Sequence, residues 1–407
     1  MSYFFHTLDN GIRIVHKPTN SYLSHCGLTI NTGSRDELNK EEGLAHFIEH
    51  IIFKGTSKRK THHVLSYMEN VGGELNAYTS KEDTCIYSSF MSPYYPRWFE
   101  LLSDIIFNST FPDKEVEKEK DVVIDEINSY KDSPGEQIID DFDELIFNDN
   151  PLGKNILGTP KNIKTFNRSK INSFIEDTYA TDEMVICSVG NISFKRLIKL
   201  SEKYFGHIPY RGRKRQRLAV NGYQPQTKVV KRRNHQVHCV IGNRAYSAND
   251  DMKTAMILLN NLLGGPVLNS RLTMAVREKH GMCYSIESNY QAYSDTGIFS
   301  IYLGTDKNFI EKAIALSYKE MDKLRMQRLG SLQLKRAKQQ LKGQVAITFE
   351  SNLNEMMSFG KSLTLFDRID TFEEIYQKID AVTTSDILDA ANNVLDPQQM
   401  SMLIYKP

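Results

Sequence analysis

A short internal repeat constrains the fold of this chain more than any other sequence feature. The segment Asp83-Thr84-Cys85-Ile86-Tyr87-Ser88 matches Asp295-Thr296-Gly297-Ile298-Phe299-Ser300, so the two copies are 212 residues apart. Tyr78 falls on Tyr290 at the same offset. Similar strand pairs and following helices are predicted around both copies. We therefore expect two homologous halves of about 200 residues each.

Apolar residues alternate in short segments that are typical of strands, and these segments are interleaved with helical patterns. Strand character is predicted for residues 12–16, 26–31, 74–79, 85–90 and 185–189, and helical character for residues 42–53, 62–70, 96–107, 114–130 and 194–204. Strict alternation of strand and helix is absent, which favours an α+β fold over a doubly wound sheet. Each half is expected to contain a mixed or antiparallel sheet flanked by helices.

A basic stretch near the middle of the chain separates the two halves. Residues 210–217 read Tyr-Arg-Gly-Arg-Lys-Arg-Gln-Arg and contain few apolar side chains. Such a charge run is typical of a solvated inter-domain segment. We predict a metal-bearing domain over 1–209, a linker over 210–226 and a homologous domain over 227–407.

Composition excludes several classes of function. The 51 lysines and arginines nearly balance the 50 acidic residues, so no overall field favours nucleic acid or an anionic membrane as a partner. The sequence has no apolar run of about 18 residues and no secretory signal pattern. The five cysteines are scattered without a C-x-x-C pair, as reduced buried thiols would be. These features predict a cytoplasmic protein.

The chemistry is concentrated in His46-x-x-Glu49-His50, which lies within an otherwise apolar segment from Leu44 to Phe53. On a helix the two histidines are one turn apart on the same face, and Glu49 lies beside them. Ionisable groups on a buried helix are costly unless they are paired or coordinated. Two imidazoles at this spacing suit Zn²⁺, and the adjacent carboxylate can act as a base toward water. The alternative is a pair of core histidines hydrogen-bonded to carbonyl groups.

A third ligand is expected on an acidic helix further along the chain, in residues 115–128. Val122, Val123, Ile124 and Ile127 mark its inward side. Glu119 and Glu126 are two turns apart on one face, whereas most of the other acids form a solvated face. The two glutamates are therefore the candidates on this helix.

His46-x-x-Glu49-His50, followed about 75 residues later by Glu126, resembles the inverted zinc signature of the pitrilysin/insulinase peptidases, and especially their mitochondrial-processing-peptidase-like branch. The resemblance covers nearly the whole chain, and further matching stretches are Thr32–Glu37, Gly72–Thr79, Pro151–Gly153 and Arg277-x₆-Tyr284. It implies that His46, His50 and Glu126 bind one zinc ion per chain. Glu49 would be the general base, and Glu119 would orient a ligand. Relatives often carry a histidine where this chain has Asn150, so we assign that loop no catalytic role.

The same resemblance implies how a substrate binds. Asn76 and Ala77 would lie on an edge strand beside the metal, where an extended peptide can pair by strand addition. Arg277 and Tyr284 would reach the substrate from the second half. Arg277 would anchor the peptide, and the Tyr284 hydroxyl would donate to the developing oxyanion.

The second half lacks the metal-binding residues. The 212-residue shift places Leu258, Asn261 and Leu262 on His46, Glu49 and His50, and it places Lys338 near Glu126 if no gaps intervene. We therefore expect a catalytically empty copy that closes over the substrate. Relatives enclose peptides within four such halves, which implies a homodimer or a heterodimer with an inactive homologue.

These expectations define a zinc metalloendopeptidase that acts on unfolded peptides or short pro-segments. Two alternatives stay open. The chain could be a non-catalytic core-type or peptide-binding subunit of a larger assembly, and it could be a dedicated maturase that cuts one leader peptide.

Overall fold

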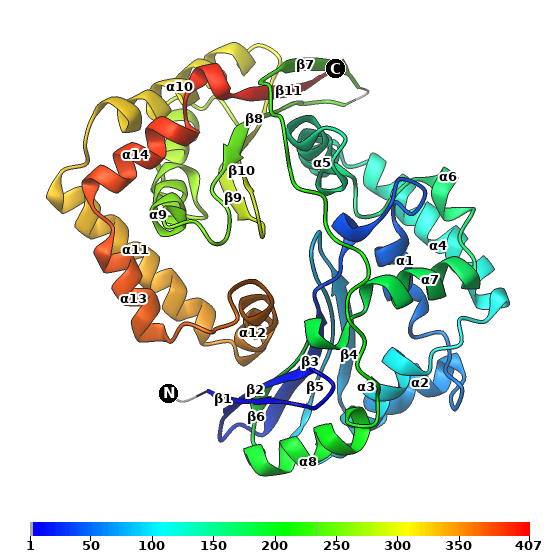
Figure 1. Ribbon diagram of the computed structural model, residues 1–407. Coiled ribbons are helices and arrows are strands. Elements are labelled where there is room, and N and C mark those ends of the chain that lie inside the picture. The colour runs from blue at the N-terminus through cyan, green and yellow to red at the C-terminus, as the bar shows by residue number, and fades with distance from the viewer. Residues whose placement is uncertain (1–2, 233) are drawn as a thin grey trace. The chain divides into compact units, whose positions relative to one another are not determined.

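The computed structural model describes residues 3–232 and 234–407 and confirms the predicted α+β fold. The chain divides into two compact units, each containing one sheet flanked by helices (Figure 1). The first unit comprises the chain as far as Asn128, residues 154–218 and residues 348–369. The second comprises Ser129–Gly153, Ala219–Ile347 and Asp370–Pro407.

The sheet of the first unit has six strands in the order β1-β2-β6-β3-β5-β4. Among the described strands of this sheet only the β2–β6 pair is parallel, so the sheet is mixed. β6 is buried along its whole length because both of its faces are covered. The strands are β1 (Phe4–Thr7), β2 (Arg13–Pro18), β3 (Leu23–Ile30), β4 (Glu74–Thr79), β5 (Thr84–Met91) and β6 (Met184–Gly190).

Helices pack their apolar residues against one face of this sheet and form the main core of the first unit. They are α1 (Leu44–Ile51), α2 (Thr61–Glu69), α3 (Tyr95–Phe107), α4 (Asp113–Lys131), α6 (Pro160–Ile163), α7 (Arg168–Thr178) and α8 (Phe194–Phe205). Short turns of 3₁₀ helix occur at η1 (Ser34–Asp36), η2 (Ser92–Tyr94) and η4 (Thr181–Glu183).

The sheet of the second unit repeats the strand order of the first. Its order β7-β11-β8-β10-β9 matches β2-β6-β3-β5-β4, and its parallel pair, β7–β11, matches β2–β6. The strands are β7 (Thr227–Lys231), β8 (Val237–Ala245), β9 (Ser285–Ala292), β10 (Gly297–Thr305) and β11 (Ser401–Lys406). The helices are α9 (Lys253–Gly264), the π-helix η5 (Thr273–Glu278), α10 (Ile310–Met326), α11 (Ser331–Phe349), α13 (Phe372–Ala381), α14 (Thr384–Val394) and the 3₁₀ turn η6 (Pro397–Gln399).

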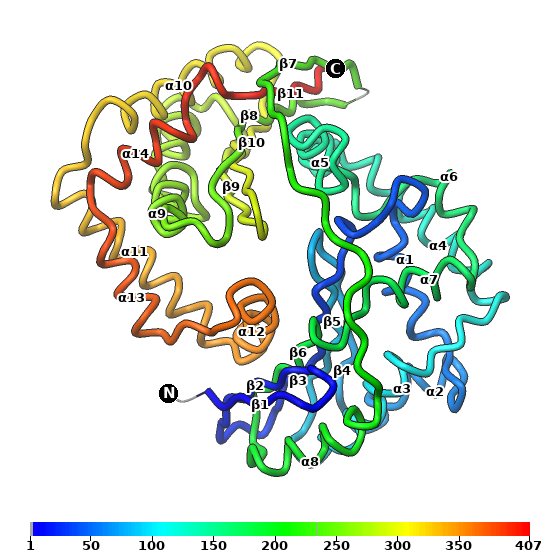
Figure 2. The backbone as a smooth tube through the Cα atoms, in the orientation of Figure 1, coloured from blue at the N-terminus to red at the C-terminus, as the bar shows by residue number. Residues whose placement is uncertain are grey.

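Two helices are exchanged between the two halves of the chain. A helix from the N-terminal half packs on the sheet of the second unit, and a helix from the C-terminal half packs on the sheet of the first unit. α5 (Pro134–Phe147), with the following 3₁₀ turn η3 (Pro151–Gly153), packs on β8, β10 and β11. Conversely, α12 (Asn352–Phe366) packs on β3 and β6. The path of the chain into and out of α5 and α12 can be followed in Figure 2. The units are therefore not the contiguous stretches 1–209 and 227–407, because burying the second face of each sheet requires a helix from elsewhere in the chain.

The basic stretch predicted as a solvated linker is bound to the first unit along residues 211–218. Arg213 and Arg217 both pair with Asp36, whose side chain is 1% exposed. Arg215 pairs with Glu41 and Asp177. A buried carboxylate requires a paired cation, which is the physical reason for this difference from the prediction.

Candidate metal centre

Helix α1 is held at its N-terminus by a buried carboxylate. Glu37 accepts hydrogen bonds from the backbone N–H groups of Gly43 (2.9 Å) and Ala45 (2.7 Å), which otherwise lack partners at a helix start. Burial raises the pKa of Glu37 well above its ordinary value, while these two amide donors lower it. Gly43 has a φ of 92°, and a Cβ there would lie 2.6 Å from the Leu157 carbonyl oxygen. Both features fix the position from which α1 starts.

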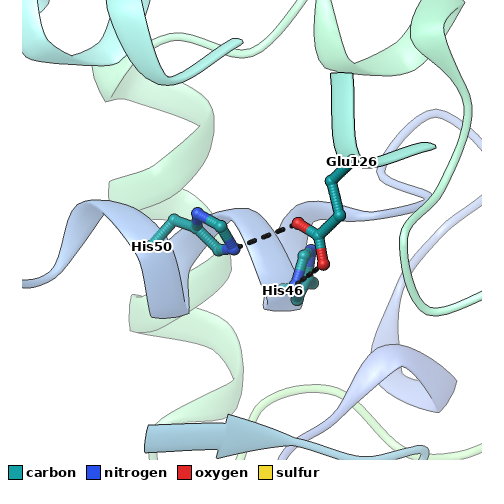
Figure 3. Close-up of side chains that lie close together, drawn as sticks. All are labelled: His46, His50 and Glu126. Atoms are coloured by element: carbon teal, nitrogen blue, oxygen red, sulfur yellow. Dashed lines mark ion pairs between the residues drawn. The ribbon is translucent and has the colours of Figure 1, made fainter. Parts of the chain in front are cut away.

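The apolar residues of α1 determine which way its histidines face. Leu44, Phe47, Ile48 and Ile51 are all buried in the core of the first unit. His46 and His50, one turn apart, lie on the side of α1 that faces Glu126 on α4 (Figure 3). The structure therefore brings the three predicted ligands together.

The distances in this cluster suit a tetrahedral metal. One ligand atom from each of His46, His50 and Glu126 lies within 4.8 Å of the others. Glu126 Oε1 lies 3.8 Å from His46 Nε2, and Glu126 Oε2 lies 3.4 Å from His50 Nε2. Ligand atoms at about 2.0–2.1 Å from a tetrahedral zinc are about 3.3 Å apart. The donor set of two imidazoles and one carboxylate therefore fits Zn²⁺ in type and in spacing.

His46 is neutral in this environment. Burial, followed by the proximity of His50, lowers its pKa to about 4. Its Nδ1 atom is buried and has no hydrogen-bond partner among the described residues. A neutral imidazole can bind a metal through one ring nitrogen, and in His46 the nitrogen that faces Glu126 is Nε2.

Glu119 orients His50. The Nδ1 atom of His50 lies 3.0 Å from Glu119 Oε1 and donates to this carboxylate, which leaves Nε2 facing Glu126 as the nitrogen that could bind a metal. Burial opposes a charge on His50, but the hydrogen bond to Glu119 and the charges of Glu126, Glu119 and Glu49 outweigh it and raise the pKa. Burial raises the pKa of Glu119, yet its bonds to His50 and Lys54 outweigh this and lower it.

Glu49 lies between the histidines in sequence and beside Thr79 of β4. Burial raises the pKa of Glu49, although Thr79 and His50 oppose the rise. A carboxylate with a raised pKa can accept and return a proton closer to neutral pH. Its position next to the cluster suits a general base.

The two predicted substrate-binding residues lie on β4, which is the outermost strand of its sheet in the described part of the chain. Ala77 packs toward the helices that cover the first sheet, while Asn76 is exposed. α1 contacts this strand directly. The edge strand is thus adjacent to the helix that carries Glu49 and the histidines.

Arg277 and Tyr284 belong to the second unit, whereas the metal cluster belongs to the first. Arg277 lies on η5 and pairs with its neighbour Glu278 at 2.9 Å. The Tyr284 hydroxyl is exposed and donates to Asp306 at 2.9 Å. Their roles toward a substrate stay predictions.

The second unit has no equivalent cluster among the residues that the structure describes. Leu258, Asn261 and Leu262 occupy α9, as the 212-residue shift predicts. α11 starts 218 residues after α4 rather than 212, so the counterpart of Glu126 is Gln344 and not Lys338. Neither a leucine nor a glutamine supplies a strong zinc ligand.

Sequence reasoning missed two residues that support the cluster. Glu37 caps α1, and the Lys54 ammonium donates to Glu119 Oε2 at 2.8 Å. Lys54 follows His50 by four residues in the sequence and lies just beyond the end of α1. That spacing was the available signal, but only the structure shows that the partner is Glu119.

The comparison with protein families agrees with this site. The model described as insulinase (peptidase family M16) matches residues 13–160, which include the metal cluster. The model described as peptidase M16 inactive domain matches residues 165–341, which include much of the unit without a cluster. The chain belongs to the insulinase (M16) family of zinc proteases, as the sequence motifs predicted.

Individual relatives cover nearly the whole chain. A Bacillus subtilis protein named uncharacterized zinc protease YmxG is 34% identical over 93% of this chain and 92% of its own length. The beta subunit of the Saccharomyces cerevisiae mitochondrial-processing peptidase is 29% identical over 97% of this chain and 89% of its own length. The crystal structure of a Helicobacter pylori protease covers all of both chains with a TM-score of 0.91 at 20% identity, a likeness that concerns the fold alone.

The structure also bears on the cysteines and on membrane spans. All five cysteines are free and buried, as their scattered positions predicted. Within residues 3–232 and 234–407, no helix is both long enough and apolar enough to span a bilayer.

Proposed function

We propose that this chain is a zinc-dependent metalloendopeptidase that hydrolyses peptide bonds in unfolded peptides or short pro-segments. The observation that carries the proposal is the cluster of His46, His50 and Glu126, with Glu49 beside it on the same helix as the histidines. The relatives named zinc proteases support the metal and the class of reaction.

The residues of the site divide the chemistry between them. Zinc, when bound, polarises the scissile carbonyl group and lowers the pKa of a water molecule. Glu49 accepts a proton from the attacking water and delivers it to the leaving amine as the C–N bond breaks. Glu119 keeps Nε2 of His50 free to bind the metal.

An extended peptide is the substrate that this site suits. The free edge of β4 lies next to α1, so a peptide that adds to β4 as a further strand passes beside Glu49. A folded protein offers few segments that can pair in this way. Within this proposal Asn76 and Ala77 hold the peptide, Arg277 anchors it, and the Tyr284 hydroxyl donates to the oxyanion.

The proposal extends to a second chain. In the described residues the first unit carries one candidate metal cluster and the second carries none, which supports the proposal of one zinc ion per chain. We expect a homodimer or a heterodimer with an inactive homologue. Size-exclusion chromatography with light scattering distinguishes both from a monomer.

The decisive experiment replaces the base and keeps the ligands. Glu49→Gln should retain about one zinc per chain and lose hydrolysis of fluorogenic peptides by several orders of magnitude. Glu69→Gln is the matched control, because Glu69 is exposed on the neighbouring helix α2. Unchanged turnover in Glu49→Gln would defeat the proposed mechanism.

The second candidate is a non-catalytic core-type or peptide-binding subunit, which the exposed edge of β4 alone would suit. It predicts peptide binding without stoichiometric zinc. Metal analysis of the purified protein separates the two, since a metalloendopeptidase retains about one zinc per chain. Profiling with peptide libraries then tests a general peptidase against a maturase for one leader.

A further inference from the structure

Lys54 follows the end of α1 and has a fixed backbone. Its N–H group donates to the Ile51 carbonyl at 3.0 Å, and its own carbonyl accepts from the Thr61 hydroxyl at 2.8 Å. The side chain therefore starts from a constrained point, so less conformational entropy is lost when its ammonium group is held in place.

The Lys54 ammonium pairs with the carboxylate oxygen of Glu119 that is not hydrogen-bonded to His50. Lys54 Nζ lies 2.8 Å from Glu119 Oε2, and His50 Nδ1 lies 3.0 Å from Glu119 Oε1. The Glu119 side chain is only 6% exposed, whereas that of Lys54 is 26% exposed. Both carboxylate oxygens thus have charged or polar partners, which fixes the plane of the carboxylate.

We propose that Lys54 is a positioning residue for the metal centre: it holds Glu119 in the orientation that directs Nε2 of His50 at the metal. The proposal rests on the proposed function only in taking His46, His50 and Glu126 as zinc ligands. Among the residues that the structure describes, the Lys54 ammonium pairs with Glu119 and not with Glu126, the carboxylate of the ligand set. Its effect reaches the metal through Glu119 and His50.

The reason for a lysine here is the burial of Glu119. A carboxylate that loses one of two partners in a largely buried site is left with an unsatisfied oxygen, and it can rotate toward other donors. Rotation of Glu119 would release the His50 ring. Groups that orient metal ligands typically change metal affinity by about 10- to 100-fold when they are removed.

The test is zinc affinity, measured by competition with a chromophoric chelator. Lys54→Met should weaken zinc binding by about 10- to 100-fold. Lys54→Arg, which keeps a cationic donor, should restore affinity to within a few-fold of the original protein. Lys58→Met is the matched control, because Lys58 is exposed in the same connection between α1 and α2 and its ammonium is not paired with Glu119 among the described residues. Its zinc affinity should be unchanged.

A second readout excludes a merely structural effect. In the Co²⁺-substituted proteins, Lys54→Met should alter the visible absorption bands of the metal, while Lys54→Arg and Lys58→Met should not. Should Lys54→Met fail to fold, as judged by the melting of the metal-free protein, Lys54→Gln is measured in its place with the same expectation.

The outcomes separate the two proposals. Equal zinc affinity and equal Co²⁺ spectra in Lys54→Met and the original protein would overturn the role of Lys54 and leave the peptidase proposal intact. An original protein that binds no zinc would overturn both. Weakened binding restored by Lys54→Arg supports the inference even if no peptide substrate has been found.

Discussion

The two units share a strand order but differ in what their corresponding helices carry. In the first unit, α1 presents His46 and His50, and α4 presents Glu119 and Glu126. In the second unit, α9 presents leucines, and the 218-residue shift places Ala337 of α11, which is buried, on Glu119. The same strand order therefore forms with an ionisable cluster in one unit and without one in the other. The comparison shows that the fold does not depend on the metal site.

The difference also has an energetic meaning. A partly buried cluster of ionisable groups is destabilising until a metal or a hydrogen-bond network compensates it. Leucine and alanine in the second unit carry no such cost. Metal removal should therefore weaken the first unit and leave the second unchanged.

The largest effect is expected when a metal ligand of the first unit is removed, because the first unit then resembles the second in lacking a complete metal site. His46→Ala should reduce zinc from about one per chain to almost none, because only two ligands remain. Asn261→Ala, at the position in α9 that corresponds to Glu49, should leave the zinc content unchanged. Metal analysis after dialysis measures both, and full zinc retention in His46→Ala would show that His46 is not a ligand.

The metal motif and the repeat were predictable because both are local in sequence. Histidines one turn apart within an apolar segment, such as His46 and His50, share a helix face by virtue of their spacing alone. The α+β class followed from mixed strand and helix patterns. The 218-residue offset of α11 was not predictable, because the extra residues before it leave the helical pattern itself unchanged.

The exchanged helices and the bound basic stretch could not be predicted for a different reason. The pattern of buried residues in α12 predicts that one face of the helix is buried, but it does not predict the sheet on which that face packs. Likewise, arginines such as Arg213 and Arg217 form the same charge run whether they face water or a buried Asp36. Partners distant in sequence determine both outcomes.

The next largest effect is expected on stability, when a buried residue of either exchanged helix, α5 or α12, is truncated. The two truncations test whether the helices play equivalent roles in the two units. Phe359 of α12 is buried against the sheet of the first unit, and Phe142 of α5 is buried against the sheet of the second unit. Truncation of each to alanine should lower the free energy of unfolding by about 3–5 kcal/mol. Urea denaturation measures both, and a large loss for only one variant would show that the two exchanged helices are not equivalent.

A smaller effect should appear on zinc binding itself. A ligand at 100 times its dissociation constant stabilises the folded state by about 2.7 kcal/mol. Hydrogen exchange should slow in α1 and α4 when zinc is added to the metal-free protein, while α9 and α11 should be unaffected. Equal protection of α9 and α11 would contradict a metal effect confined to the first unit.

The smallest effect concerns His16, a buried histidine on β2 of the first unit. His16 lies between the Ser188 hydroxyl (3.1 Å) and the Ile192 carbonyl (3.0 Å). Burial lowers the pKa of His16, and the hydrogen bonds to these two residues offset only part of the change.

Because the folded-state pKa of His16 lies below its unfolded value of about 6.5, the unfolded state binds the proton more readily. The contribution of His16 to stability is therefore complete above about pH 6.5 and is lost as the pH falls from there toward the folded-state pKa. His16→Gln should flatten the decline of unfolding free energy between about pH 7 and pH 5. His207→Gln, at an exposed histidine, should keep the original decline. Identical slopes in His16→Gln and the original protein would show that acid destabilises the first unit through other groups.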